Sequence, residues 1–141
     1  MECTVSWSGH EGGMAFVAET GSQHKLLMDG PPEAGGRNQG PRPMEMLLAG
    51  TGGCAAFDVV SILQKGHHAV SACTVRLEAE RAASDPKVFT RIHFHFCVTG
   101  TQLKPEAVAR AIELSHEKYC SASVMLGKTA VLSHDFEIIA A

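Results

Sequence analysis

The residue best placed to do chemistry is Cys54, which lies in a 23-residue stretch from Pro43 to Lys65. That stretch opens with a proline and is followed by Gly66, an arrangement typical of a helix. Polar side chains recur in it at steps of three and four residues, at Thr51, Cys54, Asp58, Ser61 and Lys65. Because such steps share one helix face and the other positions are mainly apolar, the sequence predicts a buried helix with Cys54 on its polar seam.

Three glycines, Gly50, Gly52 and Gly53, lie just before this cysteine. Each costs about 1 kcal/mol relative to alanine inside a helix. A helix that keeps all three is expected to let another backbone or a ligand come close beside the sulfur. On the pattern alone, Cys54 is either a reactive thiol or a small buried hydrophobic residue, and both interpretations stay open.

A second group with ligand chemistry is His93, His95 and Cys97, spaced at two-residue steps on one face of a predicted strand. Histidines at this spacing bind zinc in some enzymes. The simpler interpretation is a polar face covered by water or by a partner, so we expect no metal. Tyr119 is interpreted as core packing. Three cysteines are expected to be structural: Cys3, Cys73 and Cys97.

The composition favours a single domain over residues 1–141, with 45% hydrophobic residues and a net charge of −3. No dense run of lysine and arginine occurs, which argues against a nucleic acid or a membrane as partner. The five cysteines form no CxxC pair, so a disulfide framework or a zinc knuckle is not expected. The polar N-terminus lacks the shape of a signal peptide, and we expect a cytoplasmic location.

The order of predicted elements follows from periodicity and turn residues. Short strands are expected over 3–8, 14–18 and 24–28, before a Gly- and Pro-rich loop over 29–42 that is either functional or mobile. After the helix over 43–65 come strands over 69–81 and 88–99, the latter apolar on one face only. A second helix over 105–119, a short helical turn ending at 126 and a strand over 129–139 complete the chain.

Four segments of the sequence resemble the OsmC/Ohr family, named for osmotically inducible protein C and organic hydroperoxide resistance, and its YhfA-like branch in particular. They are PMEMLLAGTGGC with its continuation DVVSILQK in the first helix, FTRIHFHFCVTG in the long strand, and EKYCS after the second helix. The likeness extends over essentially the whole chain. Its most specific part is the pair of cysteines, Cys54 and Cys120.

The resemblance implies an α+β fold in which antiparallel strands wrap around two long central helices. It also implies a tightly intertwined homodimer. A helix as apolar as 43–65 is hard to bury in a 141-residue monomer with few other helices, so the composition agrees with that assembly.

The resemblance further implies reduction of organic hydroperoxides by a two-cysteine cycle. Cys54 would attack the O–O bond and become a sulfenic acid, and Cys120 would then form a disulfide with it. An external dithiol, of the lipoyl type, would reduce that disulfide, with no bound cofactor. The attacking cysteine needs a nearby cation that favours its thiolate.

Two positions depart from the peroxidase pattern of the family. The peroxidases carry a glutamate directly after the proline that opens the helix, where this chain has Met44 and then Glu45. One residue of shift rotates a helical side chain by about 100°. They also place an arginine on the N-terminal strands, whereas the first arginine here is Arg37. The expected site is therefore Cys54 and Cys120 with Glu45 and Arg42, or with Arg37 or a partner's arginine in place of Arg42.

Two other functions suit the same fold. One is a redox-sensing dimer that keeps the thiols but turns over little peroxide. The other is a dimer that binds a small apolar ligand at a methionine-rich mouth formed by Met44, Met46 and Met125.

Overall fold

The computed structural model describes all residues, 1–141, and the chain forms two compact units, residues 1–48 and 49–141. The long helix α1, Pro43–Lys65, begins in the first unit and continues in the second. Its bounds are those predicted from the sequence.

The first unit is built on a three-stranded antiparallel sheet with the strand order β1-β2-β3. Its strands are β1 (Cys3–Trp7), β2 (Ala15–Thr20) and β3 (Lys25–Asp29). These are the three strands that alternation predicted. A single 3-10 turn, η1 (His10–Gly12), connects the first two, and the Trp7 indole N–H donates to the carbonyl of Gly13 at 2.9 Å.

The loop over 29–42 is organised by the buried carboxylate of Asp29. Its Oδ1 accepts from the Gly30 N–H at 2.8 Å, and its Oδ2 accepts from the N–H groups of Arg37 and Gln39 at 3.0 and 3.1 Å. The loop also contains a 3-10 turn, η2 (Pro32–Ala34). Gly36 is required there because a Cβ atom would lie 1.7 Å from the Gly30 carbonyl oxygen. The loop thus has a polar anchor, which a search for apolar anchors in the sequence could not reveal.

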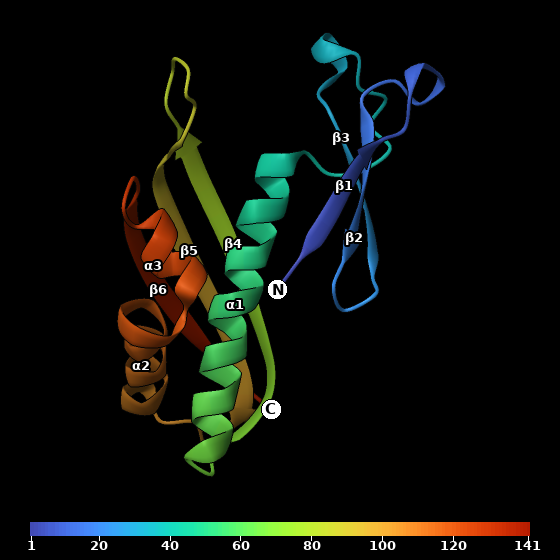
Figure 1. The fold of residues 1–141 in the computed structure, drawn as a ribbon. Helices are drawn as coiled ribbons and strands as arrows, with labels where there is room; N and C mark the ends of the chain where they lie inside the picture. Colours follow the sequence, from blue (N-terminus) through green and yellow to red (C-terminus); the bar gives the residue numbers. More distant parts are fainter. The chain divides into compact units, whose positions relative to one another are not determined.

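The second unit is built on the sheet β4-β5-β6. Its strands are β4 (Ala69–Arg81), β5 (Phe89–Thr101) and β6 (Val131–Ala140). β4 pairs with β5 in antiparallel fashion, whereas β6 returns parallel to β5. The expectation that the strands are antiparallel is therefore wrong for this last pair. Within this unit, the helices lie on one face of the sheet (Figure 1). The chain thus has a mixed α+β fold.

The core of the second unit lies between this sheet face and the helices. β5 supplies its apolar row and α1 faces that row with small and branched side chains, and both rows are almost fully buried: Ile92, Phe94, Phe96 and Val98 from β5, and Ala55, Val59 and Leu63 from α1. The predicted one-sided pattern of β5 is confirmed. Burial of apolar area at about 25 cal/mol per Å² makes this row the main stabilising feature of the unit.

Gly52 allows α1 to pack closely on β4. A Cβ atom at Gly52 would lie 2.6 Å from the Leu77 Cδ1, whereas one at Gly50 or Gly53 would meet nothing within 4 Å. Close approach inside this unit therefore explains Gly52. It does not explain the other two glycines, which border open space.

The second helical segment differs from the single long helix that the sequence predicted. It consists of α2 (Pro105–Leu114), a π-helical turn η3 (Ser115–Tyr119) and α3 (Ser121–Leu126). α1 is therefore the one long helix. A π turn carries an extra residue, which rotates position 119 off the inner face. Tyr119, expected in the core, is 50% exposed, and Cys120 is fully buried instead.

By length and composition alone, α1 would be able to cross a membrane. One such helix is weak support for a membrane protein, since core helices of soluble proteins meet the same criteria. Only 28% of its most apolar window is buried within the chain. Much of the apolar surface of α1 is therefore expected to be buried by a contact outside the chain.

The Asp29 anchor predicts a pH dependence of the loop. N–H donors from Gln39, Arg37 and Gly30 and the charge of Arg42 lower the pKa of Asp29 below 3.8, although burial opposes the shift. A group with a lowered folded-state pKa stabilises the fold above its unfolded pKa and loses that effect as the pH falls through the folded value. We expect the loop to open only in acid, below pH 3.8.

Asp29→Asn should open the loop already at pH 7, because an amide nitrogen would replace one acceptor oxygen. Hydrogen exchange at the Arg37 and Gln39 amides should become about tenfold faster or more, given the cost of an unpaired buried donor. Asp85→Asn, at an exposed turn, is the control. Unchanged exchange in Asp29→Asn would show that the carboxylate is not the anchor.

Candidate functional site

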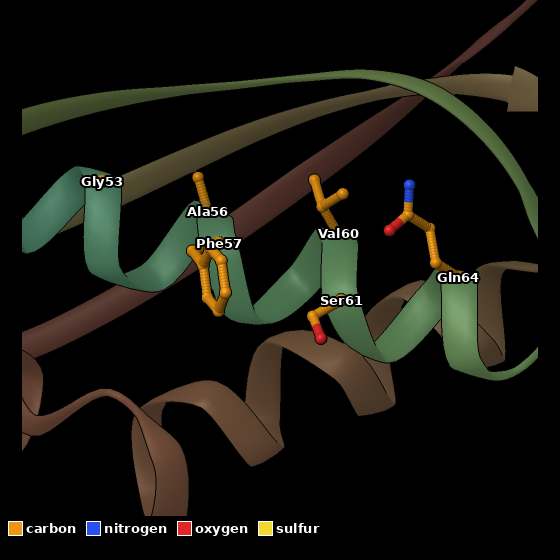
Figure 2. Close-up of a pocket in the computed structure, with 6 residues that line it drawn as sticks. All are labelled: Gly53, Ala56, Phe57, Val60, Ser61 and Gln64. Atoms are coloured by element: carbon orange, nitrogen blue, oxygen red, sulfur yellow. The ribbon is translucent and has the colours of Figure 1, made fainter.

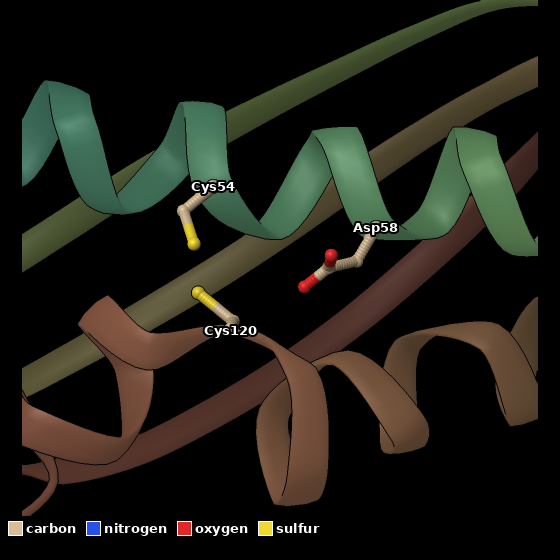
Figure 3. A group of neighbouring side chains, drawn as sticks. All are labelled: Cys54, Asp58 and Cys120. Atoms are coloured by element: carbon tan, nitrogen blue, oxygen red, sulfur yellow. The ribbon is translucent and has the colours of Figure 1, made fainter.

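The candidate site lies in the second unit, where two thiols face each other. Cys54 comes from α1 and Cys120 from the junction between η3 and α3, and their sulfur atoms point toward one another (Figure 3). The two sulfurs and a carboxylate oxygen of Asp58 all lie within 4.8 Å of one another. Both cysteines are free thiols. The structure thus brings together the two cysteines that the sequence singled out.

Backbone features hold Cys120 in this position. The Cys120 N–H donates to the Ser115 carbonyl at 2.7 Å, which closes the π turn. The Cys120 sulfur then caps α3 by accepting the Ser123 N–H at 3.4 Å. Because its backbone N–H and its sulfur are both hydrogen-bonded, the side chain of Cys120 is held in the core.

The two thiols differ in access. Cys120 is fully buried, whereas Cys54 is partly exposed. The backbone beside Cys54 is also open, since a Cβ atom at Gly53 would meet no atom within 4 Å. A small molecule arriving from outside the unit therefore reaches the sulfur of Cys54 first.

Burial also sets the protonation state of Cys120. Loss of hydration raises its pKa, and the neighbouring Cys54 thiol adds to the rise. The Ser123 hydroxyl, 3.1 Å from the sulfur, acts in the opposite direction without cancelling it. Cys120 is therefore a protonated thiol at neutral pH, and it must give up that proton when it forms a disulfide.

Asp58 lies one turn after Cys54 and is held by Ser115. The Ser115 hydroxyl lies 3.1 Å from Asp58 Oδ2 and 3.4 Å from the Ala55 carbonyl oxygen. The polar seam of the sequence indicated that Asp58 shares a face with Cys54.

His116 extends the site on the side of Cys120. Its Nδ1 lies 3.2 Å from the Ser123 hydroxyl, its ring packs edge-on against Phe94 at 4.6 Å and it stacks on His134 at 5.1 Å. Its Nε2 is buried without a hydrogen-bond partner. Burial, helped by His134, lowers the pKa of His116 to about 4, so the ring is neutral at pH 7.

Sequence reasoning missed His116 and Ser123 as members of the site. The signal was present in the segment SHEKYCSAS, where hydroxyl and imidazole groups flank Cys120 at offsets of three to five residues. The π turn adds a contact that spacing alone did not predict, because it brings the Cys120 N–H onto the Ser115 carbonyl, and single π turns are frequent at functional sites.

Arg42 and Glu45, also predicted for the site, belong to the first unit. The Arg42 guanidinium donates to the Asn38 side-chain oxygen at 3.3 Å and to the Gly40 carbonyl at 3.2 Å. Glu45 Oε1 accepts the Arg42 backbone N–H at 3.3 Å, as the glutamate of a capping box does at a helix start. Arg37, the alternative cation, donates to the Glu11 carbonyl in the same unit.

An apolar hollow follows the exposed side of α1 in the second unit. Its volume is about 350 Å³, and its lining is shown in Figure 2: Gly53, Ala56, Phe57, Val60, Ser61 and Gln64. Phe57 is 72% exposed there. Of the methionines expected around Cys54, Met44 and Met46 lie in the first unit, and Met125 is 66% exposed on α3.

Two groups of side chains have donor atoms close enough for one metal ion. One is Cys54, Asp58 and Cys120, and the other is His95, Cys97 and Glu137. In the first group, two sulfurs and one oxygen would suit a thiophilic ion.

The class of protein is defined by an α+β frame on which a buried thiol faces a more accessible one. Comparison with known proteins then identifies the family. The family described as OsmC-like protein matches residues 36–135. Protein YhfA from Escherichia coli (strain K12) is 48% identical over 141 residues, which cover 100% of both chains. The chain belongs to the OsmC-like protein family.

Solved structures show the same fold. A hypothetical protein from Aquifex aeolicus VF5 is 26% identical, with a TM-score of 0.84 over 99% of this chain and 96% of that one. An organic hydroperoxide resistance protein OsmC from Legionella pneumophila, also described as a predicted redox protein, is 17% identical, with a TM-score of 0.68 over 97% of both chains. At that identity the likeness concerns the fold alone.

The buried His116 predicts a pH dependence of stability. Because its pKa falls from 6.5 to about 4 on folding, the unfolded chain binds more protons between those values. Stability should therefore decrease as the pH falls from about 6.5 toward 4 and level off below. His116→Phe should show a smaller decrease over this window in urea unfolding at pH 7 and pH 5. The same slope in His116→Phe and wild type would contradict the assignment, and His24→Phe, at an exposed site, is the control.

Proposed function

We propose that the protein reduces organic hydroperoxides through a redox cycle of Cys54 and Cys120. The observation that carries the proposal is the approach of the two sulfurs, which point at one another within 4.8 Å. Membership of the OsmC-like family suggests a role in peroxide resistance or redox chemistry. The relative from Legionella pneumophila is itself described as an organic hydroperoxide resistance protein.

In the first step, the Cys54 sulfur attacks the outer oxygen of the hydroperoxide. The O–O bond breaks, the sulfur becomes a sulfenic acid, and the organic alcohol leaves with the remaining proton. Access supports this role for Cys54, since Cys120 has no exposed surface.

In the second step, the Cys120 sulfur attacks the sulfenic sulfur of Cys54. A disulfide forms, and the hydroxyl of the sulfenic acid leaves as water with the proton of the Cys120 thiol. Because the pKa of Cys120 is raised, that proton stays on the sulfur until the attack. The Ser123 hydroxyl, 3.1 Å from the sulfur, stabilises the developing negative charge.

In the third step, an external dithiol of the lipoyl type reduces the disulfide through a mixed disulfide with the sulfur of Cys54, the less buried of the two cysteines. One hydroperoxide and one dithiol thereby give one alcohol, one water and one oxidised dithiol. The family resemblance assigns a glutamate and an arginine to this chemistry. In this chain Glu45 stands one residue later than the peroxidase glutamate, and the first arginine is Arg37. Glu45 and Arg42 are the proposed supporting residues, with Arg37 or a partner's arginine as the alternative cation.

Oxidation of the reduced protein with one equivalent of cumene hydroperoxide should consume two thiols and link the Cys54 and Cys120 peptides. Mass spectrometry of the digested protein measures the link. Cys120→Ser should leave Cys54 as a sulfenic acid that excess peroxide oxidises further. Cys54→Ser should abolish the thiol loss. Cys3→Ser removes an exposed thiol and should behave as wild type.

Two outcomes would contradict the peroxidase proposal. One is consumption of hydroperoxide by Cys54→Ser at the wild-type rate. The other is a wild type that reacts no faster than free cysteine. A disulfide that forms rapidly but is not turned over by a dithiol would instead indicate a redox sensor.

The proposed assembly is an intertwined homodimer, with strands of both copies wrapped around the central helices. Its support is the exposed apolar side of α1, where Phe57 is 72% exposed and the adjoining Gly53 borders open space. The α1 helix of a second copy has the same apolar side and could pack against this one. Ser61, a polar residue that lines the hollow along α1, supports this cover over a membrane.

Phe57→Glu should convert the dimer into a species of 15.0 kDa, because a charge would be buried in an apolar interface. Sedimentation velocity at micromolar concentration without detergent measures it. Val131→Glu is the matched control, since Val131 is also largely exposed, at 68%, but lies on β6. A wild type that sediments as a 15.0 kDa monomer would refute the dimer.

The proposed location is the cytoplasm, where thiols stay reduced. Its support is that all five cysteines are free. The net charge of −3 gives no attraction to nucleic acid. The proposed partners are accordingly a second copy of the chain, an organic hydroperoxide and a dithiol.

A further inference from the structure

We propose that the outer face of the β5–β6 pair binds one Zn²⁺ ion through His95, Cys97 and Glu137. This face is opposite to the one that packs on the helices, so the ion would not share the dithiol of Cys54 and Cys120. The proposal does not depend on the peroxidase function. It revises the expectation of no metal on this strand.

The parallel register of β6 brings the ligands together. In that register His95 lies opposite Asp135, and Cys97 lies opposite Glu137. The strand β5 alone offers only two histidines and a cysteine in a row. β6 adds a carboxylate beside each of the last two, which turns a row of side chains into a cluster that extends over two strands.

The distances within this cluster suit one ion. The Cys97 sulfur lies 2.9 Å from Glu137 Oε1, and His95 Nε2 lies 3.5 Å from the same oxygen. The donor atoms of the three residues are all within 4.8 Å of one another. Ligand bonds of about 2.0–2.3 Å to a tetrahedral zinc put neighbouring donors roughly 3–4 Å apart. Small rotations of these side chains would complete the geometry.

Asp135 orients the His95 ring toward the proposed ion. His95 Nδ1 lies 2.7 Å from Asp135 Oδ1. In the zinc-bound form, the ring proton would lie on Nδ1, where this carboxylate accepts it, and the lone pair of Nε2 would bind the ion. A carboxylate that accepts the far N–H of a histidine is the usual support of zinc-bound imidazole, because it fixes the tautomer and the ring orientation.

The chemistry of the donors selects the ion. One sulfur, one imidazole nitrogen and one carboxylate oxygen suit Zn²⁺, whereas Mg²⁺ and Ca²⁺ take oxygen donors. On binding, Zn²⁺ replaces the proton of the Cys97 thiol, which leaves to solvent, and no electron is transferred. Three protein ligands leave a fourth position for water.

Neighbouring charges favour a cation on this face. Arg76, opposite His95 on β4, is paired with Glu78 and so is partly neutralised. His93 contacts Ser133 Oγ at 2.8 Å and Asp135 Oδ1 at 3.2 Å. A hollow of about 250 Å³ lies beside the cluster, and its lining includes Arg76, Glu78, His93 and His95.

The test uses the untagged chain with Cys54→Ser and Cys120→Ser, which removes the other thiol pair. Calorimetric titration with Zn²⁺ should give one ion per chain, and Co²⁺ in its place should give a thiolate-to-metal absorption band. Adding Cys97→Ser should remove the band and weaken zinc binding by about a hundredfold or more. Adding Asp135→Asn should keep the band and weaken binding by roughly 10–100-fold.

The matched controls are Cys3→Ser and His24→Gln, which remove an exposed thiol and an exposed imidazole in the first unit. Both should bind zinc as the parent does. Circular dichroism should show the spectrum of the Cys54→Ser, Cys120→Ser parent in the β5 and β6 variants, since His95, Cys97 and Asp135 lie on the outer face of the sheet. Zinc binding that is equally tight after Cys97→Ser and after His95→Gln would overturn the proposal. So would the absence of binding at micromolar Zn²⁺.

Discussion

The hydrogen bond from the Cys120 N–H to the Ser115 carbonyl, 2.7 Å long, is the contact on which the candidate site depends. It closes a π turn instead of an α turn, so the helix gains one residue at that point. The gain turns Tyr119 outward and Cys120 inward. It also ends the helix, because Cys120 is extended and begins the cap of α3. The position of the thiol and the return of the chain to β6 follow from this one turn.

Two cysteines of the same chemical type become different reagents because of what surrounds them. Cys54 lies beside glycine backbone and is accessible. Cys120 is enclosed by the core and keeps its proton, because burial raises its pKa. A two-cysteine cycle requires one sulfur that an oxidant can reach and a second sulfur that reacts only with the first. The difference in burial between Cys54 and Cys120 meets this requirement. The neutral His116 ring contacts the Ser123 hydroxyl, and this hydroxyl contacts the Cys120 sulfur. These two groups are the polar neighbours of Cys120 in an otherwise apolar region.

Local patterns predicted the parts of the fold that depend on local forces. Proline and glycine punctuation gave α1 its bounds, and alternation gave the buried row of β5. The π turn could not be predicted because the residues from Val108 to Tyr119 fit an α-helical stripe equally well. The parallel pairing of β6 and the Asp29 anchor could not be predicted for another reason. Both depend on partners distant in the chain, 40 residues apart for Cys97 and Glu137 and up to 10 for Asp29.

β5 connects the two clusters and also keeps them apart. Successive side chains of a strand point to opposite faces, so Phe94 and Phe96 hold the His116 ring inside while His95 and Cys97 face outward. The outer cluster can therefore be altered without removing a contact of the dithiol. A slip of one residue in register would exchange the two faces, burying the charged row and exposing the phenylalanines. The burial of Phe94 and Phe96, both fully inaccessible, thus fixes the register that assembles His95, Cys97 and Glu137 on the outside.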